Sequence, residues 1–351
     1  MYRKFVNTLV AVALVLTTMI PAGNTFAATT TKTATPETYV AKVGTDNISK
    51  EDYNIFLKDA ISMIQSYFNS YNVDWNANIN NMKASDYAKK LALDNAVDFK
   101  IQLSKAKAAK TALTKKETDD FNTNMNSYLN SLAATAAEQE KIIKNETGFT
   151  LSQFKSFYNN VSIVRKFSSQ TQSSYKFTDT ELKKFYDSNK DKFYKVIVGH
   201  ILFLSNDENN QSTPQKDAEA KKKAEDTLKK VNDPNCDFAA LVKELSEDPG
   251  SVEKGGKYTV MKNHQYVPEF ENWAVDSSRK VGDTGIVKTS YGYHVMKLMK
   301  VYSFTQLKDD IKSGYISKRY DDDLNAWRKD KKYKLVKNES VFNAIRFPKE
   351  F

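Results

Sequence analysis

The sequence has almost no cysteine, since Cys236 is the single one among 351 residues. A lone thiol cannot close an internal disulfide, so the fold must be held together by packing. No histidine lies near Cys236 in the sequence, which favours an unreactive loop thiol over a nucleophile. No cysteine follows the apolar run near the N-terminus, so we expect no lipoprotein-type anchor.

Several motifs of common enzyme classes are also missing. The chain contains no Gly-x-Ser-x-Gly hydrolase elbow, no Walker loop and no dinucleotide-binding Gly-x-Gly-x-x-Gly. The acids nearest the histidine-containing segments, Glu247, Asp248 and Glu253, lack metal-ligand spacing to any histidine. We therefore expect neither a cofactor nor a metal ion.

Long apolar runs are confined to the N-terminus. Arg3 and Lys4 precede an apolar stretch over residues 5–20, and small residues around Ala27 follow it. This order is typical of an export signal, and the run is shorter than the roughly 20 residues of a membrane-spanning helix. We predict a signal peptide over 1–27, with an uncleaved anchor as the alternative, and a flexible tether over 28–38. The remaining chain is expected to be soluble outside the cytoplasm, in the cell envelope or the medium.

The charge is basic but dispersed. The formal net charge is +10, and loss of Arg3 and Lys4 with the signal would leave 10 − 2 = +8. Lysines alternate with acids along amphipathic segments, which argues against nucleic-acid binding and favours solvated helix faces. For an exported chain, attraction to an anionic envelope or to acidic client polypeptides is a further expected consequence.

Three regions follow one another along the chain. Residues 39–194 carry Ser/Thr-x-x-Glu/Gln capping boxes ahead of apolar stripes of helical period, at Thr114, Thr150 and Thr178. Residues 195–301 change to strand-like runs, glycine turns and two short helices, and residues 302–351 return to a helical pattern. We predict an α+β insert within a mostly helical body.

Two of the three histidines, His200 and His294, lie inside apolar strand-like segments of the insert, 94 positions apart. From spacing alone, a buried structural role is the more common explanation for such residues. The surrounding segments change that interpretation. The sequence around the two histidines resembles successive blocks of the parvulin peptidyl-prolyl isomerases: 199–203, 238–251, 255–256, 267–270, 281–283 and 287–295.

The flanking helices are similar to those of the exported members of this family, the PrsA-type foldases and SurA-type chaperones. The resemblance implies a small antiparallel sheet with surrounding helices, inserted in a mostly α-helical chaperone domain built from both ends of the chain. It also implies peptidyl-prolyl isomerase activity without a cofactor, and unfolded or newly translocated polypeptides as partners. The resemblance does not decide whether the chain forms a homodimer.

The resemblance assigns roles to individual residues. The family's hydrogen-bonded histidine pair corresponds to His200 and His294, tied by Thr289, and its acidic or thiol position corresponds to Asp248. Because a carboxylate stands there, the resemblance does not favour a nucleophilic mechanism. The implied walls of the proline pocket are Tyr258, Met261, Tyr266, Phe270 and Tyr291.

The sequence departs from the family pattern at two places. The usual Gly-Gly-Asp-Leu-Gly is replaced by the segment 255–259, which contains Lys257 and Tyr258, and Tyr266 stands where methionine is usual. These departures motivate an alternative hypothesis, a non-catalytic holdase whose parvulin fold serves only as a binding module.

Overall fold

A computed structural model describes residues 39–68, 73–79, 81–206, 211, 213–345 and 347. The predicted signal peptide and tether lie outside the described residues. Among the described residues, no helix is both long and apolar enough to cross a membrane. The chain divides into two compact units, residues 1–175 with 316–351 and residues 176–315.

The first unit is mainly helical. Its helices are α1 (Lys50–Tyr67), α2 (Ala84–Ala108), α3 (Lys115–Leu132), α4 (Ala136–Thr147), α5 (Leu151–Ser174), α12 (Glu339–Asn343) and the larger part of α11 (Lys308–Lys329). A three-stranded sheet of order β2-β1-β9 joins the two chain ends, with β1 (Tyr39–Val43), β2 (Asp46–Ser49) and β9 (Leu335–Lys337). A two-stranded hairpin of β3 (Asn78–Ile79) and β4 (Met82–Lys83) precedes α2.

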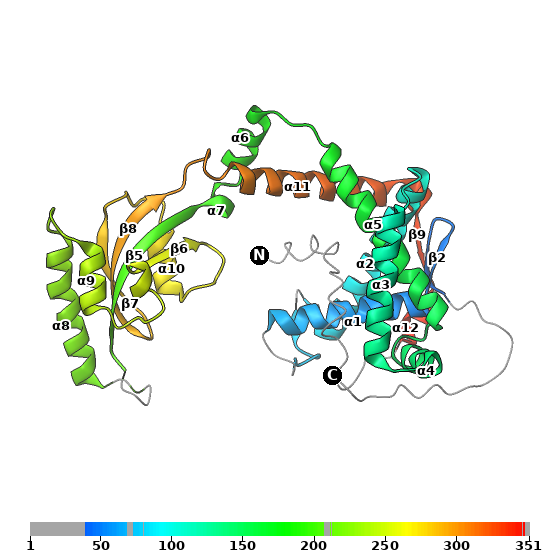
Figure 1. Ribbon diagram of the computed structural model, residues 1–351, viewed down its shortest axis with the longest axis horizontal. Coiled ribbons are helices and arrows are strands. Elements are labelled where there is room, and N and C mark those ends of the chain that lie inside the picture. Colours follow the sequence, from blue (N-terminus) through cyan, green and yellow to red (C-terminus); the bar gives the residue numbers. More distant parts are fainter. Residues whose placement is uncertain are drawn as a thin grey trace. The chain divides into compact units, whose positions relative to one another are not determined.

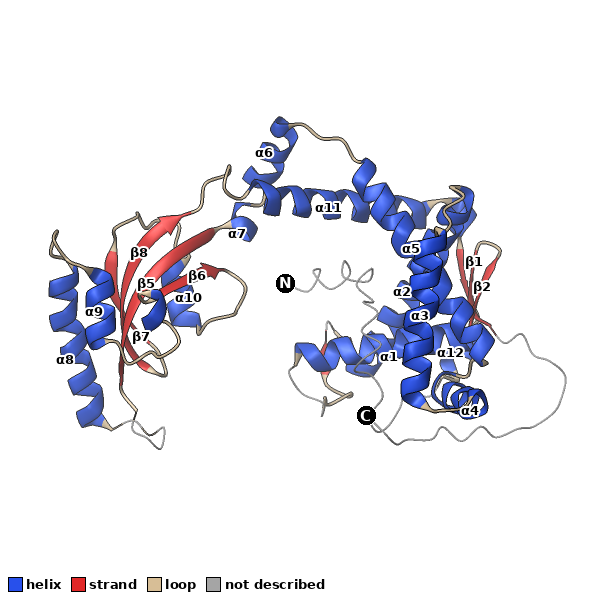
Figure 2. Ribbon diagram, viewed as in Figure 1, coloured by secondary structure: helices blue, strands red, loops and turns tan. Residues whose placement is uncertain are grey.

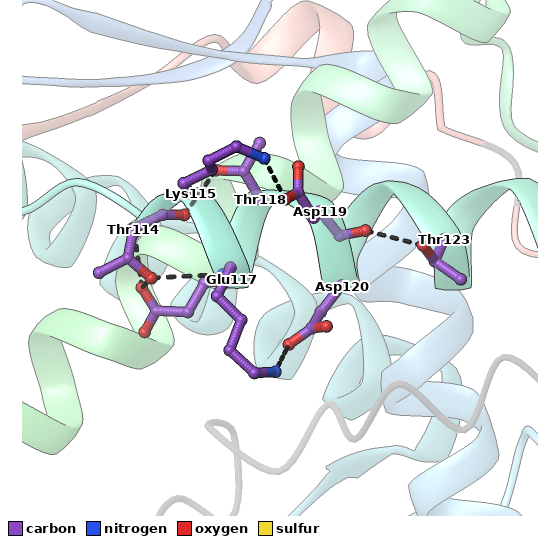
Figure 3. A network of polar contacts seen from close by, with 8 residues as sticks. Thr114, Lys115, Glu117, Thr118, Asp119, Asp120 and Thr123 are labelled. Carbon is purple, nitrogen blue, oxygen red and sulfur yellow. Dashed lines mark hydrogen bonds and ion pairs between the residues drawn. The ribbon is translucent and has the colours of Figure 1, made fainter.

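The predicted capping boxes are confirmed. Thr114, Thr150 and Thr178 each accept a hydrogen bond from the backbone N–H of the Glu or Gln three residues on, and that side chain accepts from the backbone N–H of the cap. Figure 3 shows the box at the start of α3, followed by surface ion pairs at i,i+4 spacing. Such reciprocal caps satisfy N–H groups that the first helical turn leaves without partners.

The second unit is built on a four-stranded antiparallel sheet of order β6-β5-β8-β7 (Figure 1). Its strands are β5 (Lys195–Leu204), β6 (Lys257–Met261), β7 (Thr284–Lys288) and β8 (Gly292–Val301). The helices α6 (Asp179–Asp187) and α7 (Lys190–Phe193) precede the sheet. The predicted insert, residues 195–301, lies within this unit.

Helices cover both faces of this sheet (Figure 2). One face packs against α10 (Pro268–Ala274) through a core that includes Phe270 and Trp273. The other face packs against α8 (Pro214–Val231) and α9 (Phe238–Leu245). Side chains alternate between the faces along a strand, so the buried residues of β5 and β8 are divided between the two cores. The predicted fold class, a parvulin-like α+β domain within a helical body, is confirmed.

Candidate active site

His200 and His294 meet on one face of the sheet. In the antiparallel pairing of β5 with β8, His200 lies opposite Met296, and His294 lies opposite Leu202. The two histidines are therefore diagonal neighbours, and their side chains point to the same face of the sheet. Both rings face the core that α10 covers, where they are 2% and 5% exposed. Their Nδ1 atoms are 3.1 Å apart.

A glycine lets the loop after α9 come close to His200. The backbone N–H of His200 donates to the carbonyl oxygen of Gly256 at 2.9 Å. Gly256 has a φ of +72°, and a Cβ atom there would lie 2.5 Å from the carbonyl oxygen of His200. Only glycine fits both conditions. The same loop carries Asp248 and Ser251 to the histidine ring, with the Asp248 Oδ2 atom 2.9 Å and the Ser251 Oγ atom 3.0 Å from His200 Nε2.

The polar contacts form a chain in which each donor is determined. The Asp248 carboxylate accepts, so His200 Nε2 carries a proton and, in the neutral ring, His200 Nδ1 accepts. His294 Nδ1 must then donate to His200, which leaves His294 Nε2 to accept from the Thr289 hydroxyl at 2.9 Å. The backbone N–H of Tyr291 in turn donates to Thr289 Oγ1 at 3.2 Å. With both histidines neutral, each of these contacts has one donor and one acceptor.

Burial provides that neutrality. It lowers the pKa of His200 despite the opposing pull of the Asp248 carboxylate. Burial, with repulsion from His200, lowers the pKa of His294 to about 3. Burial by itself would raise the pKa of Asp248, but hydrogen bonds from the Ser251 hydroxyl and the Gly250 N–H outweigh it, and the net shift is downward. At neutral pH the site therefore contains an ionised Asp248 carboxylate that accepts a hydrogen bond from neutral His200, which in turn accepts one from neutral His294.

These pKa shifts predict acid sensitivity of the second unit. An unfolded histidine protonates near pH 6.5, whereas folded His294 does not until about pH 3, so stability is complete above pH 6.5 and is lost as the pH falls below it. At pH 5 the cost from His294 is about 2 kcal/mol relative to pH 7. Hydrogen exchange of β5 and β8 amides in the full chain should show this loss, and His294→Gln should reduce it. His264→Gln is the matched control, because the His264 side chain is 69% exposed. An unchanged pH slope in His294→Gln would contradict the buried neutral ring.

Aromatic rings enclose the apolar side of the pair. The Phe270 ring lies 5.3 Å from the His200 ring and 5.4 Å from the His294 ring, centroid to centroid. Tyr266 packs 5.5 Å from Phe270 and donates its hydroxyl to the Thr259 carbonyl oxygen at 3.2 Å. Tyr258 packs against His200 and donates its hydroxyl to Asp248 Oδ2 at 3.1 Å. These hydrogen bonds fix the orientation of both tyrosine rings.

Two of the predicted pocket residues are not joined to this ring cluster. Met261 is half-buried at the end of β6, and strand alternation directs it to the face opposite Tyr258 and Val260. The Tyr291 side chain is exposed, and its described link to the site is through its backbone N–H. Sequence reasoning missed Ser251, which is fully buried and contacts His200. A serine after an Asp-Pro-Gly turn was visible in the sequence, but nothing local revealed that its hydroxyl turns inward.

The described residues contain no group of three or more His, Cys, Asp and Glu side chains arranged to hold a metal ion. Residues 180–302 match the family model of the PPIC-type PPIASE domain, a match that includes both histidines, the loop 248–256 and α10. The second unit contains a parvulin-type domain. The matched parvulin segment begins at α6, fifteen residues before β5.

The chain outside the parvulin domain is matched as well. It is 28% identical to the foldase protein PrsA of Clostridium acetobutylicum over 315 residues, covering 83% of this chain and 87% of that protein. It is also 28% identical to the foldase protein PrsA of Caldanaerobacter subterraneus subsp. tengcongensis, covering 86% of both chains. A solved structure of PrsA from Bacillus cereus covers 87% of this chain at 21% identity and a TM-score of 0.33. The predicted resemblance to the parvulin-type foldases is confirmed.

Proposed function

We propose that this chain is an exported foldase that catalyses cis-trans isomerisation of prolyl bonds in unfolded polypeptides, while its helical unit holds those polypeptides. The observation that carries the proposal is the one-way hydrogen-bond chain from Thr289 through both neutral histidines to Asp248, next to the rings of Phe270, Tyr258 and Tyr266. The basic net charge, +10 for the full sequence and 10 − 2 = +8 without the predicted signal, supports attraction to acidic clients and to an anionic envelope.

The chemistry requires rotation of an amide and no bond to a cofactor. Resonance in a planar amide gives a barrier of roughly 20 kcal/mol and puts partial negative charge on the carbonyl oxygen. That charge diminishes as the bond twists. A fixed carboxylate beside the carbonyl oxygen therefore raises the energy of the planar state more than that of the twisted state.

Asp248 is suited to this electrostatic role. Its Oδ2 atom accepts from His200 and from the Tyr258 hydroxyl, and its Oδ1 atom accepts from the Gly250 N–H at 3.1 Å. These donors keep the carboxylate ionised and fixed without neutralising it, since each is an uncharged group. The adjacent aromatic rings would hold the proline ring by apolar contact, so that the preceding amide lies against Asp248.

One observation favours the alternative, a holdase without catalysis. The Tyr258 and Tyr266 rings pack 5.4 Å from each other, at the positions where the sequence departs from the family pattern. Two large rings in mutual contact reduce the space left for a proline. Their hydroxyls are tied to Asp248 and Thr259, so the rings cannot turn aside without breaking these hydrogen bonds.

Refolding of a client limited by a prolyl bond separates the two functions. Uncatalysed isomerisation produces a slow phase of tens of seconds or more. Substoichiometric amounts of the full chain should accelerate this phase and leave its amplitude unchanged. A holdase would instead reduce the amplitude at stoichiometric amounts and leave the rate constant as it was, and that result would overturn the proposed catalysis.

The pH dependence of catalysis is a second expected result. The pKa values of both histidines and of Asp248 are lowered, while burial and the Asp248 charge raise the pKa of Tyr258 to about 12. No member of the network is therefore expected to change charge between about pH 6.5 and pH 9, and kcat/KM for a proline peptide should be constant over that range. An inflection near pH 6.5, the usual pKa of histidine, would show that a site histidine titrates in the free enzyme.

A further inference from the structure

The helical unit contains a cleft that plays no part in the site described above. The cleft has a volume of about 340 Å³ and lies between α5 and the middle of α11. Its lining consists of one cation, hydroxyl and amide groups of α5, and one apolar side chain of α11: Arg165, Ser168, Ser169, Gln172, Ser173 and Ile316. No carboxylate belongs to this lining.

Arg165 is the unsatisfied group of the cleft. Its side chain is half-buried, and none of the described residues offers it a hydrogen bond or an ion pair. The neighbouring cation on α5, Lys166, differs in this respect, because it pairs with Glu117 at 2.6 Å. Gln172 donates to the Ser168 hydroxyl at 2.9 Å, which leaves the Gln172 carbonyl oxygen as a further acceptor. A guanidinium without a carboxylate, in a cleft lined by hydroxyl groups, is a set of donors that suits an anionic ligand.

The polar residues form a stripe along α5. Positions 165, 168, 169, 172 and 173 follow the i, i+3, i+4, i+7, i+8 pattern of one helix face. At 1.5 Å per residue the stripe is about 12 Å long, which equals three to four residues of extended polypeptide. The hydroxyls of Ser169 and Ser173 and the amide of Gln172 are chemically matched to backbone groups over that length.

We propose that this cleft binds an extended polypeptide segment through an acidic side chain, with Arg165 pairing with the carboxylate. The inference rests on the proposed holding of unfolded chains and adds to it a position and a charge preference. A planar guanidinium pairs with a carboxylate through two parallel hydrogen bonds, which gives orientation as well as attraction.

The size of the cleft favours a peptide segment over a small anion. Its volume lies at the lower end of the roughly 300–1,000 Å³ typical of ligand sites, and is far more than one carboxylate fills. Ile316 adds an apolar contact that a peptide side chain can use and a free anion cannot. The dispersed positive charge of the chain also favours binding of acidic peptide segments, because it raises their local concentration.

Fluorescence anisotropy of a labelled flexible peptide tests the inference on the full chain. The probe contains glycine and serine with a central pair of glutamates, and its matched analogue has glutamines there. At fixed ionic strength we expect the glutamate probe to bind about tenfold more tightly than the glutamine probe. Arg165→Gln should remove this difference, and Ser169→Asp, which adds a negative charge one helical turn from the arginine, should remove it as well.

Lys155→Gln is the matched control. It removes one positive charge from the same helix, about 15 Å along its axis from Arg165, and should keep the preference for the glutamate probe. Equal binding of both probes by the wild-type chain, or the same loss in Lys155→Gln, would overturn the inference. Displacement of the probe by inorganic phosphate as effectively as by unlabelled peptide would also overturn it, in favour of a small-anion site. Isomerase activity should be unchanged in Arg165→Gln. The refolding assay tests the foldase proposal separately: if the chain does not accelerate refolding, the preference for the glutamate probe can still be measured.

Discussion

Asp248→Asn is expected to lower kcat/KM for a proline tetrapeptide by about 10²-fold while the fold is retained. Asparagine has the same shape as aspartate, and its carbonyl oxygen can still accept from His200 and Tyr258. The substitution therefore removes the charge and keeps most of the hydrogen-bond chain. If Asp248 acts by destabilising the planar amide, that loss of charge removes the effect. The measurement is a protease-coupled isomerase assay on the full chain.

Glu253→Gln is the control for Asp248→Asn. Glu253 is an exposed carboxylate two residues from Ser251, in the short helix Val252–Lys254 of the same loop. Its removal changes the net charge by the same amount but touches none of the network, so activity should stay within about twofold. Equal losses in the two variants would indicate a general charge effect. An active Asp248→Asn would contradict the electrostatic role of this carboxylate.

Arg328→Met should destabilise the helical unit by about 3–5 kcal/mol. The Arg328 guanidinium binds both carboxylate oxygens of Asp98, whose side chain is only 6% exposed. Burial raises the pKa of Asp98 even though the hydrogen bonds and charge of Arg328 oppose it, so the carboxylate is costly without its partner. The residues are separated by 230 positions, and the pair holds α11 against α2. Hydrogen exchange of α2 amides in the full chain measures the loss.

Two further variants serve as controls for Arg328→Met. The double substitution Asp98→Leu with Arg328→Met removes both charges and should restore much of the stability, because apolar side chains can replace a buried ion pair. Lys318→Met breaks a pair on the same helix in which Lys318 and Asp322 are 57% and 58% exposed, and should cost less than about 0.5 kcal/mol. A loss in Arg328→Met no larger than that in Lys318→Met would show that the buried pair contributes little.

The sequence predicted those features that depend on residues close together in the chain. The boxes at Thr114 and Thr150 involve residues three positions apart, and the strands of His200 and His294 are short apolar runs with glycines beside them. Both signals are local. The family resemblance then supplied the pairing of the two histidines, which spacing alone had left as an ordinary core arrangement.

What could not be predicted depends on contacts between distant segments. The strand β9 has three residues, and its pairing with β1 is set by tertiary packing rather than by its own pattern. Residues 257–261 form one continuous strand, which the turn-rich pattern around them does not indicate, and alternation along this strand sets Met261 on the face opposite Tyr258. The inward turn of Ser251 likewise depends on the close approach that Gly256 allows.

Exchange NMR on a short proline peptide with catalytic amounts of the full chain tests the central claim most directly. It reports the interconversion of cis and trans forms without a protease or a folding reaction. We expect exchange faster than the uncatalysed rate, unchanged cis and trans populations, and loss of the acceleration in Asp248→Asn but not in Glu253→Gln. Exchange at the uncatalysed rate, at concentrations of the chain that suppress client aggregation, would contradict it and assign the parvulin domain to binding alone.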